Sequence, residues 1–252
     1  MKDLVTRAKR RLLQMHFESR VGHIGGNLSA LDAILLLHHR VMKPADFFIL
    51  AKGHAAGALY VALWSLGKLS DEDLKTFHQD GTRLAGHPVA GWSSDIPFAT
   101  GSLGHGLPDA AGIALGLKLQ RKPGRVFCLM SDGEWEEGSN WEALIFAAHH
   151  QLRNLTILVD QNGLQGFGST REVASMDLLA DRLAGFPVEL RSVDGHDCEA
   201  MEATLQKPAT GLQLILLQTV KGHGVSFMEN VMDWHYLPLN EGQYRRALDE
   251  VR

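Results

Sequence analysis

Two side chains of metal-ligand type follow apolar runs at corresponding places in the chain. Asp132 comes just after the run 125–130, and Asn162 comes just after the run 155–160. A helical segment separates the runs, so we predict two parallel strands joined by a crossover helix, with both side chains at the strand ends where ligands gather. A carboxylate, an amide oxygen and a nearby backbone carbonyl are oxygen ligands suited to Mg²⁺. Gly133 lets the backbone approach an anion, so the stretch predicts a metal ion that holds a diphosphate.

Histidines form a second group of candidate functional residues. Five of the 13 stand in loop-like contexts, four of them beside glycine or proline: His23, His54, His87, His105 and His235. Imidazoles near a diphosphate can donate hydrogen bonds to phosphate and sugar oxygens and can move protons near neutral pH. Six others are expected to be ordinary surface, capping or core residues: His16, His38, His39, His78, His149 and His150. The sequence leaves the roles of His196 and His223 open.

The elements that must position these residues alternate along the chain. Helices are expected at 2–20, 30–41, 55–66, 108–120, 139–150, 175–184 and 198–206. Strands are expected at 47–50, 125–130, 155–160, 187–193 and 212–219. This alternation predicts an α/β fold, a doubly wound parallel sheet with helices on both faces. Because no Pro/Ser-rich linker interrupts it, we expect a single domain over 1–252.

Local signals define some of the boundaries. Ser29 is expected to cap a helix that begins at Ala30, and Ser70 with Asp73 resembles a capping box. Pro108 is expected in the first turn of its helix. The segment 80–107 is rich in glycine and reads as a long loop, and a long loop inside a compact chain is usually functional.

Composition narrows the class of protein. The chain has 252 residues, 45% hydrophobic and 21% charged, and a net charge of −4, which gives no support for a nucleic-acid partner. The basic cluster Lys9, Arg10 and Arg11 is expected to be a solvated helix face. Cys128 and Cys198 lack metal-ligand spacing and suggest a reducing compartment, with Cys128 in the core. No signal peptide or stretch of about 18 apolar residues is recognisable, so we expect no membrane association and a cytoplasmic location.

Eight ordered motifs reveal a family resemblance. They are GHIGGNLSALD (22–32), AKGHAAGALY (51–60), AGHPVAG (85–91), TGSLGHGL (100–107), SDGEWEEGSNWEA (131–143), LVDQNGLQ (158–165), VDGHD (193–197) and TVKGHGVSFME (219–229). From about residue 5 to its end, the chain resembles the N-terminal half of a transketolase, in the split form made as a separate subunit. The family binds thiamine diphosphate through a Gly-Asp-Gly motif, in which Ser131 here replaces the first glycine.

The resemblance implies roles for individual residues. Asp132, Asn162 and the Leu164 carbonyl would bind Mg²⁺, for which Ca²⁺ or Mn²⁺ can substitute, and the ion would grip the diphosphate. Thiamine diphosphate contacts would come from His54, Gly101, Leu103, Gly133, Glu142, Asn162 and His235. The catalytic group would be His23, His54, His87 and Glu137, with the three histidines facing the sugar. Glu137 and Glu142 would also join a network of carboxylates at a subunit interface, where close like charges raise one pKa.

The resemblance also implies an activity and a partner. The family transfers a two-carbon ketol unit from a ketose, or ketose phosphate, to an aldose. The pyrimidine pocket and the glutamate that activates the cofactor lie in the next domain of the family. We therefore expect half an enzyme, active with a C-terminal transketolase subunit in a heterotetramer with two copies of each chain. The tail 221–252 is expected to pack over the site or the partner.

Departures from the family pattern bear on the substrate. Ile24, His105 and Tyr236 stand where relatives often have proline, glutamine and glycine, and the ending WHYLPLNEGQY resembles split relatives of specialised sugar metabolism. The sequence does not name the donor or acceptor. Three other interpretations stay open: a nicotinamide-dependent dehydrogenase, although no strand runs into G-x-G-x-x-G, the α subunit of a 2-oxo acid dehydrogenase, and a non-catalytic scaffold.

Overall fold

A five-stranded parallel sheet forms the middle of the computed structural model, which describes residues 1–251. Its strands, in spatial order, are β1 (Phe47–Leu50), β2 (Val126–Ser131), β3 (Leu155–Gln161), β7 (Leu212–Gln218) and β6 (Val188–Asp194). The three central strands are almost wholly buried apolar runs, as strands covered on both faces are. Each predicted strand is confirmed to within one residue at either end.

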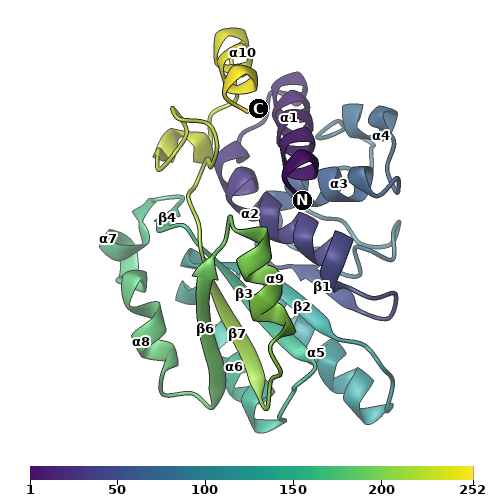
Figure 1. Cartoon of the computed structure of the whole chain (residues 1–252), viewed down its shortest axis with the longest axis vertical. Coiled ribbons are helices and arrows are strands. Elements are labelled where there is room, and N and C mark those ends of the chain that lie inside the picture. The colour runs from purple at the N-terminus through teal and green to yellow at the C-terminus, as the bar shows by residue number, and fades with distance from the viewer. Residues whose placement is uncertain (252) are drawn as a thin grey trace.

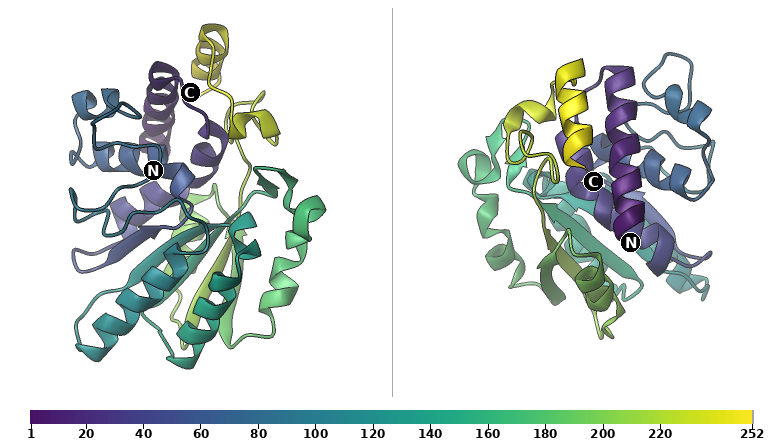
Figure 2. Two further views of the ribbon diagram at one scale, coloured as in Figure 1. Left: turned by 180° about the vertical axis from the view of Figure 1, so that it is seen from behind. Right: turned by 45° about the horizontal axis from the view of Figure 1, so that its top comes forward.

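Helices cover both faces of the sheet (Figures 1 and 2). One face carries α1 (Lys2–Ser19), α2 (Ile24–Leu36), α3 (Ala56–Ser65) and α9 (Cys198–Gln206). The other carries α5 (Gly106–Leu119), α6 (Gly138–His149) and α8 (Leu179–Leu183). Side chains of a strand point to alternate faces, so Phe127 and Leu129 join the first apolar layer while Cys128 and Met130 join the second. The predicted doubly wound α/β fold is confirmed, as is the burial of Cys128.

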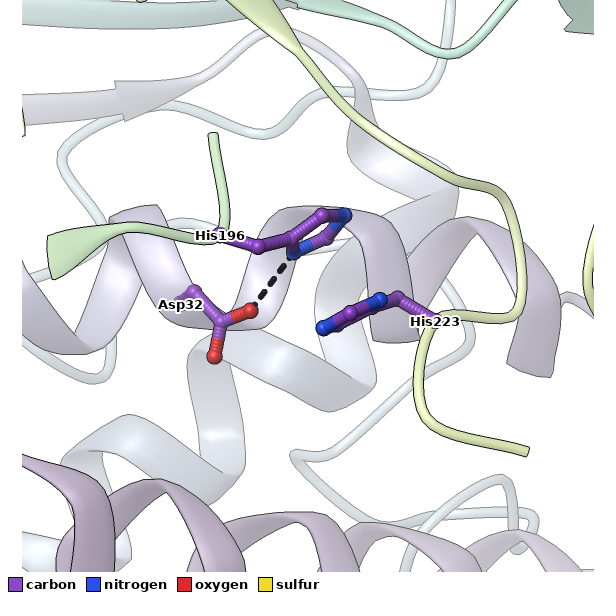
Figure 3. A group of neighbouring side chains, drawn as sticks. All are labelled: Asp32, His196 and His223. Atoms are coloured by element: carbon purple, nitrogen blue, oxygen red, sulfur yellow. Dashed lines mark hydrogen bonds and ion pairs between the residues drawn. The ribbon is translucent and has the colours of Figure 1, made fainter. Parts of the chain in front are cut away.

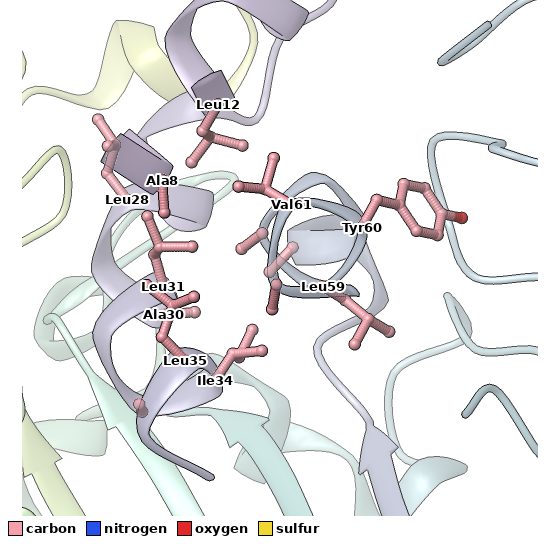
Figure 4. Packing of buried hydrophobic residues seen from close by; sticks show 14 of the residues in the cluster. Ala8, Leu12, Leu28, Ala30, Leu31, Ile34, Leu35, Leu59, Tyr60 and Val61 are labelled. Atoms are coloured by element: carbon pink, nitrogen blue, oxygen red, sulfur yellow. The ribbon is translucent and has the colours of Figure 1, made fainter. Parts of the chain in front are cut away.

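The first layer is built around α2 (Figure 4). All 13 residues of this helix are buried, and it packs between α1, α3 and the sheet. Leu31 of α2, Leu12 of α1 and Val61 of α3 lie in the same apolar cluster. A helix that is apolar around its whole circumference is stable only when it is enclosed. Truncating such a residue, as in Leu31→Ala, would cost about 2–5 kcal/mol of stability because it leaves a cavity.

Smaller elements complete the fold. The helix α2 continues into a π-helical turn (Leu37–Val41), and α4 (Asp71–Lys75) begins with the predicted capping box of Ser70 and Asp73. The remaining pieces are the hairpin strands β4 (Leu164–Gln165) and β5 (Gly168–Ser169), the helices α7 (Thr170–Ala174) and α10 (Glu241–Glu250), and 3₁₀ turns at Gly53–Ala55, Gly133–Glu136, Met176–Leu178 and Met232–His235. Residues 80–105 contain no helix or strand, as predicted, and Pro108 lies in the first turn of α5.

Two helix boundaries differ from the predictions. Ser29 does not cap a helix at Ala30, because α2 begins at Ile24 and His23 occupies the cap position with a left-handed φ of 65°. The Ser29 hydroxyl instead donates to the Asp160 carboxylate at 2.6 Å, inside the core. The predicted helix 175–184 is divided, because Ser175 adopts a φ of 54° that ends α7 before the turn and α8 begin.

The prediction of a solvated basic face on α1 is wrong for two of its three residues. Lys9 and Arg11 are buried, and only Arg10 is exposed. The Lys9 ammonium lies 3.7 Å from the Asp32 carboxylate, and Arg11 Nε donates to Asp71 Oδ1 at 2.9 Å. Their long alkyl stems cover apolar surface while the charged ends meet acids of neighbouring helices. In residues 1–251 no helix has the length and apolar character needed to cross a bilayer.

Candidate functional site

A cavity of about 240 Å³ opens beyond the carboxyl ends of β2 and β3. Ten of the residues singled out in the sequence line it together: His23, His54, His87, Gly101, Leu103, Asp132, Gly133, Asn162, Leu164 and His235. They come from segments spread over more than two hundred positions of the chain. The sheet brings them together because its parallel strands all end at this edge.

One corner of the cavity has the chemistry of a cation site. The Asp132 carboxylate is 1% exposed and accepts hydrogen bonds from the Gly133 amide at 2.9 Å and the Gly163 amide at 2.6 Å. Burial, with a contribution from Asp160, raises the pKa of Asp132 to about 6. The Asn162 amide and the Leu164 carbonyl line the same cavity. A buried carboxylate with neutral oxygen donors beside it is stabilised by a bound cation, so this donor set fits Mg²⁺.

A buried ion pair lies directly beneath this corner. The Lys52 ammonium pairs with the Asp160 carboxylate, and both residues are fully buried. Asp160 also accepts from the hydroxyls of Ser29 and Thr219 and lies 3.4 Å from the Asn162 amide nitrogen. Although burial opposes the charged form, the Lys52 ammonium holds the pKa of Asp160 below its usual value. The pair therefore fixes the Asn162 side chain from below while Lys52 itself lines the cavity.

Four imidazoles form the opposite wall, and we call His23, His54, His87 and His235 the front histidines. Ring centroids lie 5.3 Å apart for His23 and His235, 5.7 Å for His23 and His54, and 6.0 Å for His23 and His87. Burial lowers the pKa of all four, to about 4 for His23 and about 3 for His235. Within residues 1–251 none of them hydrogen-bonds a carboxylate. They are therefore neutral near pH 7, and each ring can donate one N–H and accept one hydrogen bond.

The position of the ring proton follows for His235. The Lys221 ammonium lies 2.7 Å from His235 Nδ1, and an ammonium can only donate. His235 Nδ1 therefore accepts, which places the ring proton on Nε2. Burial lowers the pKa of Lys221 to about 8. The cavity thus holds two lysines, one close beneath Asn162 and one beside His235.

Sequence reasoning missed several residues of this site. Lys52 and Lys221 stand inside the motifs AKGHAAG and TVKGHG, where the neighbouring histidine and glycines took the attention. Asn27 donates to the carbonyls of His23 at 2.8 Å and His54 at 3.0 Å, so it fixes the backbone of both. Glu134 is buried and accepts from the amides of Ser131 and Gly104, which ties the end of β2 to the long loop. Only their contacts, which join distant segments, reveal these roles.

Other residues singled out in the sequence lie outside the cavity. Glu137 and Glu142 are exposed, and neither lines the cavity. His105 is exposed and its Nδ1 lies 3.2 Å from the Ser102 carbonyl. His196 and His223 lie together near Asp32 and line a different cavity.

Comparisons with known proteins agree with this geometry. Residues 11–250 match the family model described as transketolase, thiamine diphosphate binding domain. The chain is 35% identical to one of the two apulose-4-phosphate transketolase chains of Phocaeicola vulgatus, over 96% of this chain and 90% of that protein. It is also 35% identical to the 6-deoxy-6-sulfo-D-fructose transketolase subunit SqwG of a Clostridium species, over 92% and 88%.

Longer relatives show how much of a full transketolase this chain represents. Human transketolase is 31% identical over the whole chain, which spans 42% of that protein. The crystal structure of Campylobacter jejuni transketolase superposes with a TM-score of 0.85 at 27% identity and covers 99% of this chain, which spans 43% of that one. The chain therefore belongs to the transketolase family, as a member of its thiamine diphosphate-binding domains.

Proposed function

We propose that this chain is the cofactor-binding subunit of a split transketolase, which transfers a two-carbon ketol unit from a ketose donor to an aldose acceptor. The observation that carries the proposal is the convergence of Asp132, Asn162 and the Leu164 carbonyl with four neutral imidazoles on one cavity. The first group suits a metal–diphosphate complex, and the second suits the hydroxyl and carbonyl oxygens of a sugar. Neither group alone would specify this reaction.

The proposed metal is Mg²⁺, with Ca²⁺ or Mn²⁺ as substitutes, held by Asp132, Asn162 and the Leu164 carbonyl. The charges of the cavity support a divalent ion. Lys52 and Lys221 balance Asp132 and Asp160, so the side chains alone offer a diphosphate no net positive charge. A divalent cation supplies the missing attraction in a buried place where charges are weakly screened.

The proposed cofactor contacts come from groups that line the cavity beside the metal corner. His54 and the Nε2–H of His235 are placed to donate to the diphosphate, Gly133 lets it come close to the backbone, and Lys221 adds a positive charge. Thiamine diphosphate supplies the carbon nucleophile of the reaction when it is bound. His23 and His87 would orient the ketose and would transfer protons to and from its oxygens, which neutral imidazoles can do in both directions.

A specialised sugar phosphate is the proposed substrate class. Two of the relatives are named for apulose-4-phosphate and 6-deoxy-6-sulfo-D-fructose. The Tyr236 hydroxyl donates to the Gly166 carbonyl at 3.0 Å and joins the tail to the β4–β5 hairpin at the cavity mouth. Among the residues lining the cavity, the only lysines or arginines are Lys52 and Lys221, so the charged far end of the sugar would be bound by the partner.

The proposed partner is a C-terminal transketolase subunit in a heterotetramer with two copies of each chain. The helix α6 exposes apolar side chains, with Ile145 57% and Phe146 39% exposed, next to Glu142. Large exposed apolar groups in one helix are typical of a protein interface. Glu137 and Glu142 would meet partner carboxylates there. The cytoplasmic location expected from the sequence remains a prediction.

Coexpression with the pyrimidine-domain protein tests the proposal. The purified pair should bind thiamine diphosphate with Mg²⁺ and convert a ketose phosphate and an aldose, and a specialised substrate should react faster than xylulose 5-phosphate with ribose 5-phosphate. Ile145→Asp should prevent assembly in light scattering, whereas Leu178→Asp, a similarly exposed site outside α6, should not. A correctly assembled pair that binds no thiamine diphosphate would refute the function.

A further inference from the structure

A second group of histidines lies apart from the cavity just described. Asp32 of α2, His196 after β6 and His223 after β7 offer ligand-type atoms that all lie within 4.8 Å of one another (Figure 3). We call these three residues the rear cluster. His196 Nδ1 is 2.7 Å from Asp32 Oδ2, and the rings of His196 and His223 stack with centroids 3.5 Å apart. They line a separate cavity of about 620 Å³ beside α1.

The composition of the rear cluster would suit a transition-metal ion, but its hydrogen bonds do not. The Val220 amide donates to His196 Nε2 at 2.9 Å, so that nitrogen must accept. In a neutral ring the proton then sits on Nδ1, where it is donated to Asp32. His196 is left with no free lone pair for a metal. The Lys9 ammonium, 3.7 Å from Asp32 Oδ2, already supplies the positive charge that a cation would bring.

The chain of hydrogen bonds ends on a segment that also serves the active cavity. Val220 lies between Thr219 and Lys221, in irregular backbone that follows β7. The Thr219 hydroxyl donates to Asp160, and the Lys221 ammonium contacts His235 Nδ1. One side of this segment therefore faces the rear cluster while its flanking side chains reach the proposed diphosphate site. Irregular backbone has no regular ladder to hold it, so single contacts to its amides decide where it lies.

We propose that Asp32 and His196 are positioning residues, which hold the Val220 amide and thereby keep Lys221 at the diphosphate end of the active cavity. The inference rests on the proposed function. Asp32 fixes the tautomer in which His196 Nε2 accepts. Without Asp32, the proton could move to Nε2, where it would meet the Val220 N–H and push the segment away. The stacked ring of His223 covers one face of His196 and limits its rotation.

Two substitutions at one position separate this role from simple packing. His196→Gln keeps an acceptor oxygen near the place of Nε2, whereas His196→Leu fills the space without one. Measured on the chain assembled with its pyrimidine-domain subunit, His196→Leu should weaken thiamine diphosphate binding in saturating Mg²⁺ about tenfold, the loss of one hydrogen bond plus part of the Lys221 contact. His196→Gln should stay within about threefold of the wild type. If His196→Leu does not fold, His196→Asn withdraws the same polar group by one methylene and replaces it in the comparison.

A double-mutant cycle and amide exchange complete the test. In a Lys221→Met background, His196→Leu should change the cofactor dissociation constant less than about twofold, because the residue it acts through is gone. Hydrogen exchange of the Val220 amide should be faster in His196→Leu than in His196→Gln without any cofactor present. Full additivity in the cycle, or equal exchange in the two variants, would overturn the inference while leaving the function intact.

Equilibrium dialysis of the assembled wild-type protein against Zn²⁺ addresses the alternative. We expect no Zn²⁺ bound at the rear cluster. One tightly bound ion per chain that is lost in His196→Leu would show a metal centre and overturn the positioning role. Failure of the wild-type pair to bind thiamine diphosphate at all would instead count against the proposed function.

Discussion

The front histidines and the rear cluster use the same side chain in opposite ways. Within residues 1–251, no front histidine hydrogen-bonds a carboxylate, and their rings line a cavity shared with Lys52 and Lys221. In the rear cluster, His196 donates to Asp32, accepts from Val220 and stacks on His223. The front group is short of negative charge, and the rear group has its own.

The difference shows how partners rather than residue types separate a binding site from a support. Donors without partners in a buried wall carry a desolvation cost that a bound anion can offset. Donors that are already paired rigidify the backbone they touch and gain little from a ligand. Altering one group at a time should therefore separate the two roles, with expected effects that run from the metal corner, the largest, to a single titration, the smallest.

Removing the proposed metal ligand should have the largest effect. Asp132→Ala takes away the one charged ligand, so Mg²⁺-dependent binding of thiamine diphosphate by the assembled pair should weaken at least about 100-fold and activity should be lost. Circular dichroism should show an unchanged fold. The matched control is Asp181→Ala, which removes an exposed carboxylate of α8 and should leave binding unchanged. Ordinary activity in Asp132→Ala would remove this residue from the site.

Removing substrate-facing imidazoles should reduce turnover but spare cofactor binding. His23→Ala and His87→Ala should each lower kcat about 10²-fold, the usual contribution of a proton-transfer or oxyanion group. The dissociation constant of thiamine diphosphate should stay within about threefold of the wild type. His149→Ala, an exposed histidine of α6, is the control. A variant that mainly loses cofactor affinity would place its histidine at the diphosphate.

Neutralising one cavity lysine should give a salt-sensitive loss of affinity. Lys221→Met keeps the alkyl stem and removes the charge beside the diphosphate, so the dissociation constant should rise about tenfold in low salt. The difference from wild type should shrink as ionic strength rises, to the extent that solvent reaches the site. Lys9→Met removes the lysine beside the rear cluster and should not change the salt dependence of binding. Equal behaviour of the two variants would contradict the contrast between the groups.

The smallest effect concerns pH. Burial lowers the pKa of His23 to about 4, whereas an unfolded histidine titrates near 6.5. Between these values the unfolded chain binds more protons, so the free energy of unfolding should fall as pH falls from about 6.5 to 4. His23→Gln removes this term and should make the loss between pH 7 and 5 smaller by about 1 kcal/mol, after allowance for partial exposure. Urea unfolding at both pH values measures it, and an unchanged loss would contradict it.

Much of the architecture could be predicted from the sequence. Apolar runs of strand length, separated by helical patterns, located every strand of the main sheet, and the residues at strand ends located the metal corner. The failures have local causes. Ser29 has the composition of a cap, but its hydroxyl is needed by Asp160, whose partner Lys52 lies far away in the sequence. Lys9 and Arg11 read as solvated because their acidic partners lie on other helices.

The candidate site was predictable where a motif names a chemical role and unpredictable where a residue acts through a contact. Asp132, Asn162 and the front histidines stand in recognisable patterns. Asn27 and Glu134 act by holding backbone groups of distant segments, and no spacing in the sequence reveals that. The rear cluster joins three segments that only the packing of α2 against the ends of β6 and β7 brings together.

Calorimetric titration of thiamine diphosphate into the chain assembled with its pyrimidine-domain subunit tests the central claim most directly. With Mg²⁺ present, the account predicts one site per chain. After removal of divalent ions with EDTA, the heat of binding should disappear, and thiamine without its diphosphate should not bind measurably in either case. Equal affinity with and without Mg²⁺, or thiamine binding as tightly as its diphosphate, would contradict the metal–diphosphate site.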